Sequence, residues 1–308
     1  MSELKDFLYR LNHELKPRRP DIIEKDYHLH RLLHAISHDR YLSRNMVFKG
    51  GTCLVKAHTD YYRFSEDLDF TWGDISIWDG RMPSQIRKRC SREIDTIIEH
   101  LGEIADDLGL MFDGDKSDRG QIIIGGGGRM PRFYLSYTSV ITNAIAKAKV
   151  DVNFVDRTLY PYQTKYLKSY LKDYRNKELA LLFREEYNSY TSPITMECYA
   201  PMEIYTDKCR AAMTRIAYKL RDIIDIYMLE EQYGYTIQEY KAPILEKTRF
   251  MLDLYTKYRK NMETTRLPDA GDITREELNL LIIEMPEKLE KNIQRIHDQI
   301  NLIKGEMI

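Results

Sequence analysis

The chain has 308 residues, of which 43% are hydrophobic and 31% are charged, and its formal net charge is −1. This length allows one large or two ordinary domains with a sizeable core. The near-neutral charge does not indicate general nucleic-acid binding, which usually appears as a basic excess. Because the sequence has no apolar run long enough to span a membrane and no signal-peptide pattern, we expect a cytoplasmic protein with no membrane partner.

The four cysteines give no indication of a metal site or a disulfide framework. Cys53, Cys90, Cys198 and Cys209 are scattered, and no two of them form a Cys-x-x-Cys pair. We expect ordinary, partly buried thiols.

The N-terminal region predicts two helices, over residues 3–15 and 20–38. Apolar residues recur in both at helical rather than alternating spacing. The second segment also contains the sequence Glu24-Lys25-Asp26-Tyr27.

The next stretch combines a glycine turn with a pair of acids. A short strand ending at Lys49 leads into Gly50-Gly51, and a helix is expected to open at Thr52. A second strand then carries Asp67 and Asp69, two residues apart, so both carboxylates point to one face.

This combination is typical of a nucleotide-handling site. Mg²⁺ prefers one or two carboxylates together with phosphate oxygens, and Mn²⁺ is the alternative metal. Backbone N–H groups at a glycine turn and a helix start favour phosphate. Replacing Asp67 or Asp69 by alanine should abolish activity. Because the two carboxylates repel each other, either replacement should leave the fold intact or slightly more stable.

The middle of the chain predicts a long helix and several strands. Residues 83–108 are amphipathic, with isoleucines and a leucine on one side. Four glycines at 125–128 do not form a phosphate-binding P-loop, because a strand over 132–140 follows them instead of a helix. In residues 149–154, Asp151 shares a face with Lys149 and Asn153, where a lone aspartate usually faces solvent.

Residues 159–200 are rich in tyrosine, and we expect a helix over 163–173. Tyrosines are interleaved here with Lys165, Lys168, Lys172, Arg175 and Lys177. Aromatic rings beside cations suit single-stranded nucleic acid, although a solvated basic face is the simpler interpretation.

The last third predicts helices. Pro201 begins a segment in which Glu203, Lys208, Arg215 and Asp222 recur at helical intervals, a pattern that a charged helix face also explains. Asp222 or Asp225 could pair structurally with Lys208 or Arg215. Residues 239–263 and 273–304 predict two long helices that complete a bundle.

Three of these patches resemble motifs of the AbiEii/AbiGii toxin-type nucleotidyltransferases, within the DNA polymerase beta-like superfamily. They are Gly50-Gly51-Thr52, the run from Arg63 to Phe70, and the 203–227 region; Glu24 to Tyr27 also recurs in this family. The resemblance implies an α+β (mixed α/β) fold. Residues 1–200 would form a polymerase beta-like core with a mixed sheet and flanking helices, and residues 201–308 a helical domain.

The resemblance also implies roles for individual residues. The superfamily pattern requires a third acid on a strand beside Asp-x-Asp, and Asp151 is the best-placed candidate. The family's lysine contacts the triphosphate and its downstream aspartate helps to assemble the site, which implies these roles for Lys208 and Asp222.

The predicted activity is metal-dependent transfer of a nucleoside monophosphate from a nucleoside triphosphate to an acceptor hydroxyl, with release of pyrophosphate. Asp151 is expected nearest the attacking hydroxyl, as a metal ligand or a base. The predicted catalytic residues are Asp67, Asp69, Asp151, Lys208 and Asp222; the predicted metal ligands are the first three of these; and the predicted nucleotide contacts are Gly50, Gly51, Thr52, Ser65 and Lys208.

The resemblance further implies the toxin of a type IV toxin–antitoxin or abortive-infection pair, with a cognate antitoxin and an RNA acceptor such as tRNA. A small-molecule (antibiotic-type) or protein nucleotidyltransferase, and a non-catalytic nucleotide-binding module, are the alternatives. The sequence does not specify the nucleotide, the acceptor or the oligomeric state. It also leaves open the roles of Arg63, Glu203, Arg215, Arg221 and Asp225.

Overall fold

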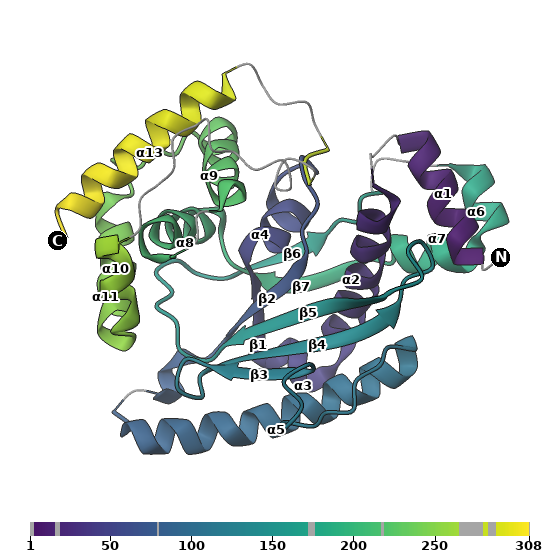
Figure 1. Cartoon of the computed structure of the whole chain (residues 1–308), viewed down its shortest axis with the longest axis horizontal. Helices are drawn as coiled ribbons and strands as arrows, with labels where there is room; N and C mark the ends of the chain where they lie inside the picture. Colours follow the sequence, from purple (N-terminus) through teal and green to yellow (C-terminus); the bar gives the residue numbers. More distant parts are fainter. Residues whose placement is uncertain are drawn as a thin grey trace. The chain divides into compact units, whose positions relative to one another are not determined.

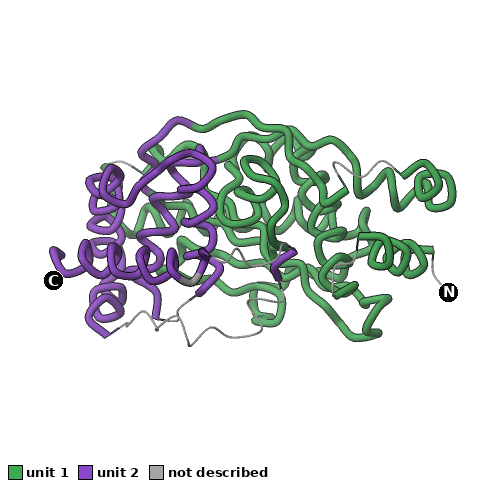
Figure 2. Tube along the Cα trace, turned by 90° about the horizontal axis from the view of Figure 1, so that it is seen from above, with its two compact units in different colours: residues 1–156, 162–198 green, residues 157–161, 199–308 purple. Residues whose placement is uncertain are grey.

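A computed structural model describes residues 3–15, 19–78, 80–171, 176–216, 219–264, 280–282 and 288–307. The chain divides into two compact units (Figure 2). Unit 1 consists of Met1–Asp156 and Tyr162–Cys198, and unit 2 of Arg157–Pro161 and Tyr199–Ile308. Unit 1 is interrupted in sequence because the short 157–161 segment belongs to unit 2.

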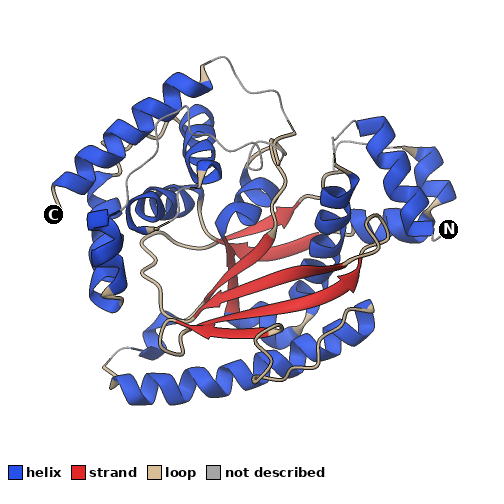
Figure 3. Ribbon diagram, in the orientation of Figure 1, coloured by secondary structure: helices blue, strands red, loops and turns tan. Residues whose placement is uncertain are grey.

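Unit 1 is built on a seven-stranded mixed sheet with strand order β3-β4-β5-β2-β1-β7-β6 (Figures 1 and 3). β2 pairs in parallel with β5, β1 pairs in parallel with β7, and the other neighbours are antiparallel. The predicted α+β class with a mixed sheet is confirmed. The strands are β1 (Met46–Lys49), β2 (Asp67–Trp72), β3 (Ile122–Gly125), β4 (Met130–Thr138), β5 (Ile145–Asn153), β6 (Gln163–Leu167) and β7 (Ile194–Cys198).

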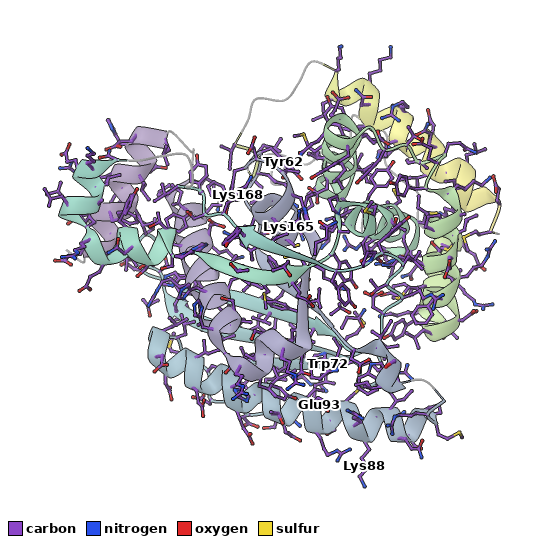
Figure 4. All side chains as sticks on the ribbon, turned by 180° about the vertical axis from the view of Figure 1, so that it is seen from behind. Tyr62, Trp72, Lys88, Glu93, Lys165 and Lys168 are labelled. Atoms are coloured by element: carbon purple, nitrogen blue, oxygen red, sulfur yellow. The ribbon has the colours of Figure 1, made fainter. Side chains whose placement is uncertain are left out.

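Helices of unit 1 pack on the apolar side of this sheet. α2 contacts β2, β5 and β7, and α5 contacts α2 and α3. α2 crosses behind the strands in Figure 1 and in front of them in the reversed view of Figure 4. The predicted helices over 3–15, 20–38 and 83–108 are confirmed as α1 (Glu3–Leu15), α2 (Pro20–His38) and α5 (Pro83–Leu108). Unit 1 also contains α3 (Arg40–Asn45), α6 (Lys177–Leu182), α7 (Arg184–Thr191), the 3-10 helix η2 (Ile75–Trp78) and the helical turns after β1.

The glycine turn takes the conformation that its sequence requires. Gly50 has φ +77°, which favours glycine, and α4 (Gly50–Cys53) starts there, two residues before the predicted start at Thr52. The chain continues as a π-helix, η1 (Leu54–His58). Such single turns of π-helix often occur at functional sites.

The helix predicted over 163–173 is wrong. Residues 163–167 form the edge strand β6, paired antiparallel with β7. Thr164 and Tyr166 have high β-propensity, and the β7 edge supplies hydrogen-bond partners that no local helical signal could indicate. Residues 172–175, which include Lys172 and Arg175, lie outside the described part of the chain.

Unit 2 is helical, and its helices pack around α8. The helix predicted over 239–263 is broken at Tyr255 and Thr256, so it forms two helices. Of the helix predicted over 273–304, residues 289–304 are helical, whereas 273–279 and 283–287 lie outside the described residues. The helices are α8 (Pro201–Thr214), α9 (Leu220–Tyr233), α10 (Lys241–Leu254), α11 (Lys257–Thr264) and α13 (Leu289–Gly305).

Two further expectations concern cysteines and membranes. All four cysteines are buried and in the thiol form. In the described part of the chain, no helix is both long enough and apolar enough to cross a bilayer.

A buried ion pair ties α2 to the π-helix that follows the glycine turn. The Lys56 ammonium lies 3.0 Å from the Asp26 carboxylate, and each side chain is 1% exposed. The hydroxyl of Tyr190 donates to Asp26 (2.7 Å), and Lys56 donates to the hydroxyl of Tyr61 (2.6 Å). Asp26 thus connects α2 to Lys56 of the π-helix and to Tyr190 of α7.

Replacing Lys56 by alanine should therefore destabilise the protein by about 3 kcal/mol or more, because it leaves Asp26 buried without its cation. The double variant Lys56→Met/Asp26→Asn removes both charges and should recover much of this loss. Urea-induced unfolding measures both. A cost below about 1 kcal/mol for the single substitution would contradict the assignment.

Candidate functional site

The strand register brings the three predicted acids together on one face of the sheet. In the parallel pairing of β2 with β5, Asp69 lies directly opposite Asp151, and Asp67 lies opposite Lys149. Asp67 and Asp69 share a face because they are two residues apart on β2. Two residues separated by 82 positions in the chain thus become immediate neighbours.

Cations flank this pair of acids on the adjoining strands. Lys49 lies opposite Asp69 in the β1–β2 pairing, and Arg132 lies opposite Asp151 in the β4–β5 pairing. A row of four charged residues, Lys49, Asp69, Asp151 and Arg132, therefore crosses four adjacent strands. Neither Lys49 nor Arg132 can be assigned to the site from sequence alone, because their positions depend on strand register.

Asp69 is the least compensated acid of the row. It is half-buried, and its carboxylate forms no hydrogen bond or salt bridge with the described residues. Burial raises the pKa of Asp69, and the neighbouring carboxylates of Asp151 and Asp67 raise it further, with only partial opposition from Lys149 and Lys49. A cation placed here would relieve this repulsion.

Asp67 and Asp151 have cationic partners from the protein itself. Lys149 lies 2.6 Å from Asp67 and 3.4 Å from Asp151. Arg132 binds Asp151 through two hydrogen bonds, of 2.7 and 3.0 Å. Although burial lowers the pKa of Lys149, its attraction to Asp67 and Asp151 raises the pKa overall.

The glycine turn lies directly against Asp69. A Cβ atom on Gly50 would come within 2.5 Å of the Asp69 Oδ2 atom, so only glycine fits. The hydroxyl of Thr52 lies 2.6 Å from that of Ser65 and also within hydrogen-bonding distance of the Asp67 main-chain carbonyl. The turn and the start of β2 are thereby joined, and all of the nucleotide contacts predicted in unit 1 meet at one place.

Two residues of the Glu24-to-Tyr27 motif contact other parts of unit 1 from α2. Glu24, which is buried, accepts hydrogen bonds from the Ser139 hydroxyl (2.5 Å) and the Val140 N–H (2.7 Å). Lys25 lies 3.5 Å from Glu66, the residue before Asp67. The motif therefore acts as a structural support, a role that its sequence alone does not indicate.

Two other residues near the site are held inward. Lys49 lies 2.6 Å from Asp156, and both side chains are largely buried. Arg63, which the sequence left without a role, is 1% exposed and donates to the Phe64 carbonyl (2.9 Å). The structure thus gives Arg63 a packing environment.

In unit 2, Lys208 is the centre of a buried ionic network. Its ammonium lies 2.7 Å from Asp222 and 2.6 Å from Asp225, and Arg215 also contacts Asp222. Although burial opposes it, the attraction of Lys208 and Arg215 holds the pKa of Asp222 below its usual range. The alternative prediction, that Asp222 or Asp225 pairs structurally with Lys208 or Arg215, therefore agrees with the structure.

A second network in unit 2 involves Glu203, whose role the sequence left open. Its side chain is completely buried against Lys247 and accepts hydrogen bonds from the N–H groups of Leu159 (2.8 Å) and Tyr160 (2.9 Å). Glu203 thereby fixes the 157–161 segment to α8.

The donor chemistry of the sheet site fits a divalent cation. Three carboxylates offer the oxygen ligands that Mg²⁺ and Mn²⁺ accept, and the charge of Asp69 is only partly compensated by Lys149 and Lys49. Within the described residues, no group of three or more His, Cys, Asp or Glu side chains is arranged to hold a metal as it stands. Lys149 and Arg132 bind the oxygens of Asp67 and Asp151 instead.

Comparisons with known proteins find one matching family and several similar structures. A family model described as the nucleotidyl transferase AbiEii toxin of type IV toxin–antitoxin systems matches residues 31–299. The nucleotidyltransferase toxin MenT4 from Mycobacterium tuberculosis has a similar structure, with a TM-score of 0.52 and 16% identity over 96% of this chain and 89% of that one. JHP933 from Helicobacter pylori gives a TM-score of 0.39 and 17% identity over 92% and 96%. No curated protein matches the chain.

The raised pKa of Asp69 predicts how stability changes with pH. Ionised Asp69 opposes folding at neutral pH, so Asp69→Asn should raise the free energy of unfolding at pH 7. The difference from the wild type should vanish below about pH 3.9, where the carboxyl is protonated in the folded and unfolded chains alike.

Urea-induced unfolding at several pH values measures this effect, with the exposed Asp107→Asn on α5 as the matched control. A lower stability of Asp69→Asn at pH 7 would refute the electrostatic account. The sequence predicts that replacing Asp67 leaves the fold intact or slightly more stable. In the structure Asp67 pairs with Lys149, so we expect Asp67→Asn not to stabilise the fold.

Proposed function

The chain belongs to the AbiEii family of nucleotidyltransferase toxins of type IV toxin–antitoxin systems, and on this basis we propose that it transfers a nucleoside monophosphate to a hydroxyl of an RNA such as tRNA. The observation that carries this proposal is the pairing of Asp69 with Asp151 beside the Gly50 turn. A cognate antitoxin is the proposed genetic partner.

Asp67, Asp69 and Asp151 are the residues that would hold the divalent cation, Mg²⁺ or Mn²⁺. When bound, this cation neutralises the carboxylates and supplies charge stabilisation for the phosphates. Asp69 would gain most from such a cation, because burial and, after it, the two neighbouring carboxylates raise its pKa.

The remaining steps use the residues of the chain. Gly51 and Thr52 bind the triphosphate at the glycine turn through backbone N–H groups. Ser65 orients Thr52 through the hydrogen bond between their hydroxyls. Asp151 lies nearest the acceptor hydroxyl and orients it or takes its proton. The acceptor oxygen forms a bond to the α-phosphorus as the bond to pyrophosphate breaks, so positioning and charge neutralisation do most of the work.

Two cationic side chains, Lys149 and Arg132, also take part in this mechanism. Lys149 and Arg132 already neutralise Asp67 and Asp151. Arg132 is 41% exposed at its side chain and has a planar fork suited to phosphate as well as to carboxylate. We propose that both residues stabilise the negative charge of the reacting phosphates.

Label transfer tests the proposal. Each α-labelled nucleoside triphosphate is offered with total RNA, protein extract and aminoglycosides, and the label should appear in RNA. Asp69→Asn and Asp151→Asn should lower the transfer rate by about a hundred-fold or more, whereas Asp107→Asn should not change it. Label in protein or aminoglycoside alone, or full activity of Asp69→Asn, would overturn the assignment.

Lys208 is the proposed triphosphate contact from unit 2, and it needs a separate test. Lys208→Ala would leave Asp222 and Asp225 buried without their cation and would destabilise the unit. Lys208→Arg keeps the charge but changes the donor geometry. We expect Lys208→Arg to raise the KM for the nucleotide about tenfold, equivalent to about 1.4 kcal/mol, with little change in unfolding. An unchanged KM would assign Lys208 to structure alone.

A further inference from the structure

The acid-free segment from residue 119 to residue 150 has an unusual charge composition. It contains five cations, Arg119, Arg129, Arg132, Lys147 and Lys149, and neither Asp nor Glu, in a chain whose overall net charge is −1. The segment includes β3 and β4 and extends along β5 as far as Asp151. Its positive charge is therefore concentrated next to the proposed reaction site.

The strands sort this segment into two faces. Arg132, Tyr134 and Ser136 alternate with buried residues along β4, and Lys147 and Lys149 do the same along β5. The register places Tyr134 opposite Lys149, and Ser136 opposite Lys147. Because partners in register share a face, all of these polar side chains belong to the same face as Asp151.

These side chains form a continuous strip that begins at Asp151. Arg132 binds Asp151, and Tyr134 follows Arg132 two residues along β4 on the same face. The ammonium of Lys147 lies 5.0 Å from the centre of the Tyr134 ring and donates to the Gly120 carbonyl (2.8 Å). The Tyr134 ring therefore lies beside Lys147 and near Arg132 on this face of the sheet.

This strip is on the opposite side of the sheet from α2. α2 packs behind β5, and Figure 1 shows β4 and β5 in front of that helix. Lys147 is exposed, and Tyr134 is partly buried. The strip is therefore accessible from the face of unit 1 that carries the acids.

We propose that the single-stranded end of the acceptor RNA lies along this strip, with one base stacked on Tyr134 and phosphates bound by Lys147 and Arg132. This inference rests on the proposed RNA acceptor. Sheets recognise single-stranded RNA by stacking bases on aromatic side chains, with cations along the backbone. The strip would lead the terminal hydroxyl to Asp151.

The basic residues of α5 provide the matched control. Lys88 is exposed and forms no ion pair with the described residues, as Lys147 does not, but it lies on α5 and is not part of the strip on β4 and β5 (Figure 4). If the RNA were attracted only by general positive charge, Lys88 and Lys147 would contribute alike.

Fluorescence anisotropy with a labelled, mixed-sequence single-stranded RNA of about ten nucleotides tests the proposal directly. Tyr134→Ala should weaken binding about tenfold, since stacking of one base is worth roughly 1–3 kcal/mol, whereas Tyr134→Phe should bind like the wild type. Lys147→Ala should lower the slope of log K against log salt by about 0.7. Lys88→Ala should change neither quantity.

Several results would overturn the inference. These are wild-type affinity in both Tyr134→Ala and Lys147→Ala, or an equal loss in Lys88→Ala. Lys147 is an exposed residue, so its variant remains informative if Tyr134→Ala does not fold. The wild-type label-transfer result separates the two proposals: label in RNA with unaffected variants rejects only the strip, whereas no label in RNA rejects the acceptor itself.

Discussion

Repulsion between carboxylates is the constraint on which the rest of the site depends. The parallel pairing of β2 with β5 forces Asp69 against Asp151, with Asp67 two residues away on the same face. Such an arrangement is unfavourable unless positive charge is supplied. Lys149 and Arg132 neutralise the outer acids, and Asp69 keeps a raised pKa. This remaining repulsion at Asp69 is the reason for proposing a divalent cation there.

Much of this site could be predicted from the sequence, because its signals are local. Gly50 needs a positive φ and has no space for a Cβ, and Asp67 and Asp69 show their shared face by spacing alone. Asp151 could be proposed only through the family pattern, since nothing in its own strand distinguishes it from a solvent-facing acid. Arg132 and Lys49 could not be assigned, because their positions come from the pairing of strands that are distant in sequence.

The errors have the same physical origin. Residues 163–167 have no strong local preference against a helix, and the β7 edge decides their conformation. Asp26 lies in a helix whose pattern predicts only an amphipathic face, but the fold buries it against Lys56 and Tyr190. Tertiary contacts outweigh local propensity at residues 163–167, and at Asp26 they supply partners that the helical pattern does not show.

The most direct test of the central claim is equilibrium binding of Mn²⁺, followed by the paramagnetic resonance of the free ion in the presence of a non-hydrolysable nucleoside triphosphate. The account predicts that wild-type protein binds Mn²⁺ and that Asp69→Asn and Asp151→Asn each weaken binding by at least about tenfold, while Asp107→Asn binds normally. Equal binding by Asp69→Asn and the wild type would contradict the claim that these carboxylates form the metal site.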